Sequence, residues 1–432
     1  MPMTPKRQIN IGILGLGVVG SGTVRVLQEN AQDIARKVGL PVVVRRVAVR
    51  DTSKPRDVVL PAGVLTGRAE DVTDDPEIDI LCELIGGVRP AHDLVLRAIQ
   101  SGKNIVTANK EMMAKAGHDL LHEAERRDLD FNFEGSVGGG IPIIQPLKQA
   151  LAANRFTHLM GIVNGTTNYI LSKMTTEDAD FADVLASAQA HGYAEPDPTS
   201  DVEGFDAQYK TAILSSIAFT SRVLPEDIYV EGITRITKRD IEVARDLGYV
   251  IKIVGIGEDL GDALQVRVHP VLLPRPHPLA SVNAVYHGIY LRGNAVGDVM
   301  FYGRGAGSLP TGSAVAGDVI EIARNIVRGA TGRLGCTCFD RKPALLIERL
   351  RTKYYIRLLA HDRPKVLASL ASVFGDFNVS IESVVQRALP DGDAEIVWIT
   401  HQTLEANLRS ALDVIKRLHI VSGIENWIRV EE

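Results

Sequence analysis

The first third of the chain alternates short apolar runs with longer amphipathic stretches, which indicates alternating strands and helices. We expect strands at 8–14, 41–50, 78–85 and 104–107. The valine-rich run at 41–50 is typical of a strand covered on both faces. One helix follows the first strand through Leu27, and another begins at Pro90 and ends before Gly102. This β-α-β order predicts a parallel, doubly wound sheet of the Rossmann type with right-handed crossovers.

The pattern changes twice further along the chain. From about residue 141, helices mix with longer strands such as 263–273, which predicts a mixed α+β domain. A glycine-rich segment at 302–307 then leads into a helix at 311–328. The tail predicts strands at 354–359, 379–385, 395–400 and 424–430 with helices at 365–374 and 404–418. This βαββαβ order is typical of a small ferredoxin-like domain.

These changes suggest domain boundaries. A chain of 432 residues should form two to four domains of ~150 residues. We expect a dinucleotide-binding domain at 1–140, completed by 303–330, and a second domain at 141–302. A basic, polar linker at 331–350 then precedes a tail domain at 351–432.

Composition narrows the class of protein. The 45% apolar and 23% charged fractions are those of an ordinary soluble globular protein. The net charge is −5 and basic residues are dispersed, so we expect no nucleic-acid partner. We see neither a leader's apolar core nor the ~20 apolar residues of a membrane span, and expect no membrane partner.

Three cysteines make a sparse set, which fits a reducing, cytoplasmic location. Cys336-Thr-Cys338 could indicate a metal or redox site. Such sites need three or four ligands, and we identify no second Cys or His pair at ligand spacing. We therefore expect a structural role for this pair.

A Gly-x-Gly-x-x-Gly pattern follows the first strand, at Gly15-Leu16-Gly17-Val18-Val19-Gly20. Its place between a strand and a helix makes it meaningful for dinucleotide binding. Gly15 permits the tight turn, Gly17 lets the backbone approach a pyrophosphate, and Gly20 allows close helix–sheet packing. The helix N-terminus offers free N–H groups to the phosphates.

The end of the second strand bears on the cofactor's 2′ substituent. A carboxylate there accepts a hydrogen bond from a ribose hydroxyl, whereas an arginine accommodates a 2′-phosphate. The chain has Arg50 followed by Asp51, so both remain open. Arg50 ends the strand and Lys54 and Arg56 lie close in sequence, which favours NADP over NAD.

The acid-rich segment from Gly192 to Lys210 is the most informative stretch. Its first half contains Pro196 and Pro198 and is predicted to be an ordered loop. Its second half begins an apolar helix in which Asp206 and Lys210 are four residues apart and share a face. A surface salt bridge is the alternative, but burial of such a helix argues for function. A lysine ammonium can polarise an aldehyde and donate a proton to the developing alkoxide, while nearby carboxylates hold a substrate ammonium and keep the lysine charged.

At these residues the sequence resembles homoserine dehydrogenase, which interconverts aspartate 4-semialdehyde and homoserine. The resemblance covers nearly the whole chain through several ordered motifs: the glycine pattern, Glu83-Leu-Ile-Gly-Gly87, Thr107-Ala-Asn-Lys110, Asn164-Gly-Thr-Thr-Asn168, Gly192 to Lys210, and Tyr302 to Thr311. It implies an NAD(P)-dependent oxidoreductase in threonine, methionine and isoleucine biosynthesis. It also implies a homodimer or homotetramer and makes 141–302 the substrate-binding and dimerisation domain.

The resemblance assigns roles to single residues. Lys210 is implied to be the proton donor, with Lys110 as a second lysine near the nicotinamide and substrate. Binding residues implied for the substrate are Glu195, Asp206, Asp201 and Gly192, and those for the cofactor include Thr107 and Gly303.

The family also binds a structural monovalent cation, usually sodium, in a hinge loop. Glu134 is implied to give a carboxylate, and Val137, Gly139 and Ile141 to give backbone carbonyls. Oxygen ligands of this kind suit hard cations. From the residues alone, the glycines at 138–140 indicate a flexible hinge, which is compatible with a cation site.

The tail resembles an ACT domain, a regulatory module that binds amino acids, often threonine in this family. The resemblance rests on the segments 360–368 and 380–386. Position 365 is lysine where the family usually has glycine, whose missing side chain lets a ligand approach the backbone. Threonine binding and a role in oligomerisation alone both remain open.

Two other functions compete with this interpretation. A related semialdehyde or 2-oxo-acid reductase could share the cofactor domain, but enzymes that make acyl-phosphates need a catalytic cysteine. Cys82 lies inside a predicted strand and is a poor nucleophile there. A sensing module without turnover would have no need of a buried proton donor at Lys210.

Overall fold

The computed structural model describes residues 6–390 and 392–431. The chain forms two compact units, each described by itself below. The first contains residues up to Thr157, Tyr209–Pro225 and Leu291–Lys342, and the second contains His158–Gln208, Glu226–Tyr290 and Pro343–Glu432. Both units draw on segments that are distant in sequence, so the domain boundaries expected from sequence stay a prediction.

The first unit contains a six-stranded parallel sheet of order β3-β2-β1-β4-β5-β6. Its strands are β1 (Ile9–Leu14), β2 (Val42–Ala48), β3 (Leu65–Thr66), β4 (Ile80–Glu83), β5 (Asn104–Thr107) and β6 (Phe131–Asn132). The order reverses between β1 and β4, where doubly wound sheets bind their ligands. The predicted Rossmann-type sheet is therefore confirmed, and the four expected strands lie within the predicted runs.

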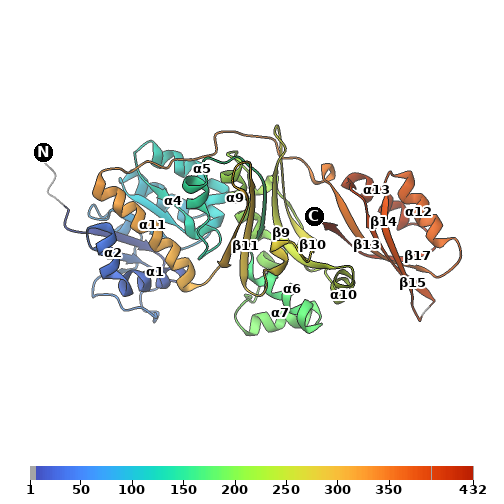
Figure 1. Cartoon of the computed structure of the whole chain (residues 1–432). Helices are drawn as coiled ribbons and strands as arrows, with labels where there is room; N and C mark the ends of the chain where they lie inside the picture. Colours follow the sequence, from blue (N-terminus) through green and yellow to red (C-terminus); the bar gives the residue numbers. More distant parts are fainter. Residues whose placement is uncertain (1–5, 391, 432) are drawn as a thin grey trace. The chain divides into compact units, whose positions relative to one another are not determined.

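Helices cover this sheet in two groups. One group is α1 (Val18–Glu29), α2 (Ala31–Val38) and α11 (Ser308–Arg328), and Figure 1 shows α11 in orange beside α1 and α2 in blue. Their apolar side chains, such as Val24 and Val319, share one core with β1. The other group is α4 (Ala91–Gln100) and α5 (Lys110–Glu125), which pack on each other. In the described part of the chain, none of the helices combines the length and apolar character needed to cross a membrane.

The remaining elements of the first unit are short or come from distant segments. They are α3 (Glu70–Thr73), a 3-10 turn (Glu134–Ser136), a π-helical turn (Pro146–Ala150) and β12 (Gly297–Arg304). Most of α9 (Phe205–Ala218) also belongs to this unit. The predicted helix at 311–328 begins three residues earlier, at Ser308, in α11.

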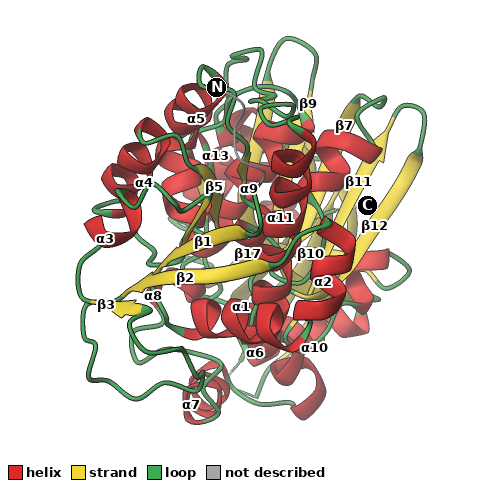
Figure 2. Ribbon diagram, turned by 90° about the vertical axis from the view of Figure 1, so that its left-hand side faces the viewer, coloured by secondary structure: helices red, strands yellow, loops and turns green. Residues whose placement is uncertain are grey.

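The second unit is built on the antiparallel pair β9 and β10, which Figure 2 shows side by side. The sheet order is β11-β7-β9-β10-β17-β13-β15-β14. Strands of its first half are β7 (Phe156–Ile162), β8 (Tyr229–Val230), β9 (Tyr249–Asp259), β10 (Leu264–Pro274) and β11 (Tyr286–Gly293). Helices are α6 (Gly165–Glu177), α7 (Phe181–Ala190), α8 (Thr199–Val202) and α10 (Lys238–Asp246). The mixed α+β character expected here is confirmed.

The tail forms the predicted βαββαβ arrangement. Its elements are β13 (Arg351–His361), α12 (Val366–Asp376), β14 (Ile381–Ala388), β15 (Asp393–Thr400), α13 (Glu405–Ile415) and β17 (Val421–Val430), with a short β16 (Thr403–Leu404). The strand order β17-β13-β15-β14 is that of a ferredoxin-like sheet. Phe374 and Trp398 stack edge to face in its core, with ring centroids 5.3 Å apart.

The junction between the tail and the rest of the second unit was not foreseen from sequence. Strand β17 pairs in parallel with β10, with Arg429 opposite Val271, so one sheet runs through both parts. Across the junction, the fully buried Arg429 guanidinium donates to the Glu231 carboxylate at 3.0 Å, and the buried Arg267 guanidinium donates to the Glu431 carboxylate at 2.9 Å. Buried charges require such partners, so this junction is specific rather than a loose linker.

Candidate functional site

The glycine turn after β1 has the geometry that the sequence pattern predicts. Gly15 adopts the left-handed region (φ 94°), and a Cβ added there would lie 2.7 Å from the carbonyl oxygen of Leu84. A Cβ at Gly20 would overlap the carbonyl oxygen of Gly15, whereas one at Gly17 would meet no atom within 4 Å. Gly15 and Gly20 are therefore needed for the fold of the turn, and Gly17 leaves open space beside the first turn of α1.

A cleft of about 1080 Å³ opens at this turn. It is bordered by the glycine turn, the segment after β2 and the loop after β4, and its lining includes Leu16, Gly17, Val18, Arg50, Ile85 and Ser308. The cleft lies at the switch point of the sheet and at the N-terminus of α1, where backbone N–H groups favour phosphate. These residues fit a dinucleotide cofactor.

Charged groups at the end of β2 line the same cleft. Arg50, Lys54 and Arg56 contribute three cations. The Asp51 carboxylate accepts hydrogen bonds from the backbone N–H (2.9 Å) and hydroxyl (2.6 Å) of Ser53, which lower the pKa of Asp51. One oxygen of the carboxylate is thus already committed within the loop, and the balance of charge favours an anionic 2′ substituent.

A buried carboxylate organises the loop on the other side of the cleft. Glu83 accepts hydrogen bonds from the Thr107 hydroxyl (2.6 Å) and the backbone N–H of Ile85 (2.9 Å). Asn109 caps α5 by accepting from Met112 N at 3.1 Å, and its amide nitrogen donates to the Gly87 carbonyl at 2.6 Å. These contacts place Lys110 at the first residue of α5.

Lys210 lies on α9 one turn after Asp206. Both side chains are buried, at 7% and 4% exposure. The rest of the helix is largely apolar and buried, and Lys115 of α5 lies 5.1 Å from the Tyr209 ring. The alternative of a surface salt bridge is excluded by this burial. Lys110 and Lys210 therefore belong to neighbouring helices of the first unit.

Two carboxylates of the acid-rich segment are brought together by one asparagine. The Asn164 amide nitrogen donates to Asp201 Oδ1 at 2.6 Å and to Asp206 Oδ2 at 2.8 Å. Its oxygen accepts from Thr167 N at 2.8 Å and caps α6. Asn164 thus fixes both acids relative to the start of α6.

Glu195 and Gly192 lie in the loop before α8. Both residues are exposed, Gly192 adopts a left-handed conformation (φ 73°), and the Glu195 carbonyl accepts from the Gln189 side chain at 3.2 Å. The predicted loop is confirmed, and the contact with Gln189 fixes its backbone rather than the Glu195 carboxylate.

The segment expected to hold a cation has an unusual carboxylate. Glu134 is buried and accepts three backbone N–H bonds, from Ile143 (2.6 Å), Ile144 (2.8 Å) and Gln145 (2.7 Å). Burial nevertheless raises the pKa of Glu134. Glu134 therefore caps the N-terminus of the turn that follows. This structural role comes in addition to any role in binding an ion.

The other expected cation ligands lie in the same loop. Among the described residues, no backbone N–H donates to the carbonyl oxygens of Val137, Gly139 or Ile141. These oxygens are available to a hard cation, so the residues fit a cation site. Gly303 lies in β12 against Ile141, and a Cβ there would be 3.1 Å from the Ile141 side chain.

Three family models match the chain. They are "Homoserine dehydrogenase" at residues 142–320, "Homoserine dehydrogenase, NAD binding domain" at 15–134, and "ACT domain" at 354–419. A homoserine dehydrogenase from Synechocystis sp. is 48% identical, over 98% of this chain and 99% of that protein. The chain belongs to the homoserine dehydrogenase family. It is an NAD(P)-dependent oxidoreductase that acts on a CH–OH group.

Solved structures agree with the homoserine dehydrogenase fold. The crystal structure of a homoserine dehydrogenase from Thiobacillus denitrificans has a TM-score of 0.93 and 43% identity, covering 98% of each chain. A hyperthermophilic archaeal homoserine dehydrogenase in complex with NADPH has a TM-score of 0.63 and 25% identity, covering 73% of this chain and 97% of that one.

Cys82 is poorly placed to act as a nucleophile. The Cys82 side chain is fully buried in β4, and burial raises the pKa of its thiol. The expectation that Cys82 is a poor nucleophile is confirmed, which removes the acyl-phosphate alternative.

Sequence reasoning missed two organising residues of this homoserine dehydrogenase. Asn164 and Glu83 stood inside motifs that carried the family resemblance, but neither was assigned a role. The signal for Asn164 was its place before a helix, since asparagine is a preferred N-cap. Nothing in the sequence indicated that its amide nitrogen reaches two aspartates.

Proposed function

We propose that the chain reduces L-aspartate 4-semialdehyde to L-homoserine, with Lys210 as the proton donor. The cofactor supplies a hydride to the aldehyde carbon. The Lys210 ammonium hydrogen-bonds the carbonyl oxygen and transfers its proton to that oxygen as the carbon–oxygen double bond becomes single. The observation that carries this proposal is a buried lysine one helical turn from a buried aspartate.

The carboxylates serve the other end of the substrate. Asp206 and Asp201, held by Asn164, bind the α-ammonium group together with Glu195 from the loop. Asp206 also favours the charged form of a lysine four residues later, which suits reduction. Gly192 borders the substrate, and Lys110 at the start of α5 assists at the nicotinamide end.

We infer that NADP is preferred over NAD. Arg50, Lys54 and Arg56 line the cleft, and the Asp51 carboxylate accepts hydrogen bonds from Ser53. An exposed arginine can face a 2′-phosphate, whereas a committed carboxylate offers less to a ribose hydroxyl. The archaeal homoserine dehydrogenase solved in complex with NADPH shows that a relative of this fold binds the phosphorylated cofactor. Gly15–Gly20, Thr107 and Gly303 complete the proposed binding set.

We further propose that sodium binds the loop at 134–141, through the carbonyl oxygens of Val137, Gly139 and Ile141. The Glu134 carboxylate keeps acceptor capacity on Oε2, which receives one hydrogen bond. Its negative charge would be stabilised by a cation, since burial opposes ionisation there.

The ACT domain has two candidate roles, effector binding and assembly of the oligomer, and one experiment distinguishes them. Lys365 is exposed and adopts the left-handed conformation (φ 76°) that glycine favours. Its side chain stands where the family usually leaves space for threonine, so the domain either binds an effector or serves assembly as a homodimer or homotetramer. Titrating threonine against activity in wild type and Lys365→Gly distinguishes them: inhibition of the wild type requires an effector site.

The pathway and location follow from the proposed reaction. Homoserine is a precursor of threonine, methionine and isoleucine in the pathway that the resemblance implies. We propose a cytoplasmic location, which the sparse cysteines support.

One assay tests the reaction. We expect homoserine-dependent reduction of the cofactor, with a higher kcat/KM for NADP than for NAD. The oxidation rate should rise with pH well above neutrality, because the Lys210 ammonium must lose its proton before it can accept one. A profile that peaks at acidic pH would contradict a lysine base, and no homoserine-dependent rate would contradict the reaction.

A further inference from the structure

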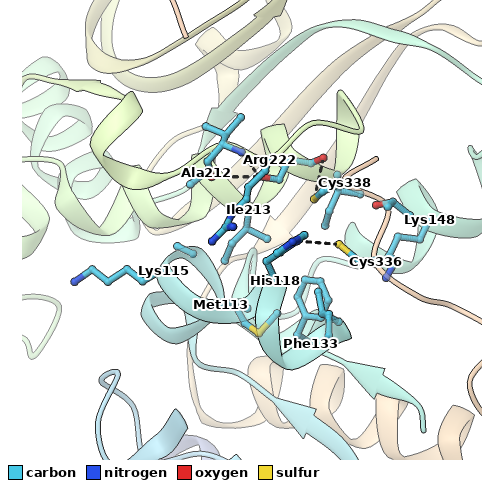
Figure 3. Close-up of a pocket in the computed structure, with 17 residues that line it drawn as sticks. Met113, Lys115, His118, Phe133, Lys148, Ala212, Ile213, Arg222, Cys336 and Cys338 are labelled. Atoms are coloured by element: carbon cyan, nitrogen blue, oxygen red, sulfur yellow. Dashed lines mark hydrogen bonds between the residues drawn. The ribbon is translucent and has the colours of Figure 1, made fainter. Parts of the chain in front are cut away.

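Helix α5 presents two histidines to a cysteine from a distant segment. His118 and His122 are one turn apart on α5, and Cys336 lies in the connector after α11. One ligand atom of each lies within 4.8 Å of the other two. Figure 3 shows the His118 ring turned toward the Cys336 sulfur, with Nδ1 3.8 Å from Sγ. The expectation that no His pair accompanies the cysteines is therefore wrong.

The cluster borders a small cavity inside the first unit. The cavity has a volume of about 50 Å³, enough for an ion with a water molecule, and its lining comes from α5, α9 and the connector. Cys338 also lines it, with Sγ 3.7 Å from the Ser216 carbonyl oxygen of α9. His118 and Cys336 thus line a cavity between packed elements, whereas the His122 side chain is half-exposed.

The donor set fits zinc. Imidazole nitrogen with thiolate sulfur is the ligand combination of many tetrahedral zinc sites. Cysteine binds zinc as the thiolate, and the Cys336 sulfur already lies 3.8 Å from His118 Nδ1. The Glu125 carboxylate lies 3.3 Å from His122 Nδ1. Carboxylates in this position orient the histidine ligands of metal sites.

The spacing is close to that of a formed site. Zinc bonds of about 2.0–2.3 Å place neighbouring ligand atoms roughly 3.3–3.8 Å apart. The His118–Cys336 distance already meets this value. His122 has a half-exposed side chain and can close the remaining distance, of about 1 Å, by side-chain rotation.

The connector is shaped to approach α5 closely. Gly335 precedes Cys336, and a Cβ there would overlap the Glu125 carboxylate. Three basic residues, Lys115, Lys148 and Arg222, also line the cavity, so a metal ion there needs the negative charge of a Cys336 thiolate.

We propose that His118, His122 and Cys336 bind a zinc ion, with water in the fourth position. The site fastens the connector to α5, the helix that begins at Lys110. It is separate from the cofactor cleft and does not rest on the proposed reaction.

The test measures metal in the full-length protein without turnover. Purified protein should bind one equivalent of Zn²⁺, and Co²⁺ in its place should give a thiolate-to-cobalt charge-transfer band. Cys336→Ser should remove the band and weaken zinc binding at least about tenfold. Cys336→His should restore zinc binding without the band. His118→Ala and His122→Ala should each weaken zinc binding, with the thiolate band reduced.

Matched controls separate this site from other thiols and histidines. Cys82→Ala and His92→Ala should keep both zinc and the band, and NADPH binding reports that each variant is folded. Zinc binding that is absent in wild type, or unchanged in Cys336→Ser, would overturn the proposal. Formation of a Cys336–Cys338 disulfide by the protein in the presence of zinc would overturn it as well.

Discussion

The glycine turn and the carboxylate group, which is formed by Asp201 and Asp206 around the Asn164 amide, are suited to recognition by different physical means. The turn is one contiguous segment whose backbone shape requires the missing side chains at Gly15 and Gly20, while Gly17 leaves open space beside it. The carboxylate group joins side chains from the start of α6, from α8 and from α9 through one amide. Backbone recognition is thus local in sequence, whereas side-chain recognition depends on distant segments meeting.

The difference has a consequence for substitutions. In the turn, an added methyl group acts only by occupying volume. Its effect therefore depends on whether that volume is needed by the protein or by the cofactor. In the carboxylate group, removal of the Asn164 amide takes one shared hydrogen-bond donor away from both aspartates. Single substitutions can therefore distinguish an effect on the fold from an effect on binding.

Gly17→Ala should weaken NADPH binding by about 10²-fold or more, because its methyl group enters the space that the pyrophosphate needs. Its Tm should stay at the wild-type value, since nothing lies within 4 Å of that methyl group. Isothermal titration and thermal melting measure the two quantities. Gly20→Ala is the matched variant and should lower Tm, because its Cβ overlaps the Gly15 carbonyl oxygen. Equal loss of Tm in both variants would contradict the distinction.

Asn164→Ala should lower kcat/KM for homoserine by roughly 5- to 150-fold, the effect of about 1–3 kcal/mol expected when the donor that Asp201 and Asp206 share is lost. It should also lower Tm, because the cap of α6 is lost. Asn164→Ser keeps a capping oxygen but lacks the amide donor. It should therefore keep most of the Tm and still lose kcat/KM. A wild-type kcat/KM in the serine variant would show that the amide donor is unimportant.

Arg50→Ala should lower kcat/KM for NADP by about tenfold, the value of one charge-assisted contact at an exposed site. The value for NAD should hardly change, because NAD lacks the 2′-phosphate. The measurement is a pair of steady-state assays at constant ionic strength. Arg36→Ala on α2 is the control. A parallel loss with both cofactors would indicate a structural role for Arg50.

Asp318→Asn should stabilise the protein slightly, and more as the pH rises. Burial raises the pKa of Asp318 well above its unfolded value, with Glu134 adding to the effect. The folded carboxyl group holds its proton, so its stabilising contribution is complete below the unfolded pKa and is lost as pH rises toward the folded pKa. Tm curves of the variant and wild type should meet near pH ~4 and diverge toward neutrality. Parallel curves, as expected for the exposed control Asp33→Asn, would contradict the assignment.

Much of the fold was predictable because its determinants are local. The strand β5 matches its predicted residues, and the glycine turn and the loop at Glu195 follow from glycine and proline positions. The pairing of β17 with β10 was not predictable, because its register depends on the partners of Arg429 across the sheet. The same holds for Asn164, and for His118 meeting Cys336, which lies 218 residues away in sequence.

The central claim is that Lys210 donates the proton, and its removal tests this most directly. Lys210→Ala should lower kcat for aspartate semialdehyde reduction by roughly 10²–10⁴-fold, the usual contribution of a general acid. The dissociation constant of NADPH should stay near its wild-type value, and Lys173→Ala on α6 should leave both quantities unchanged. A wild-type kcat in Lys210→Ala would contradict the account.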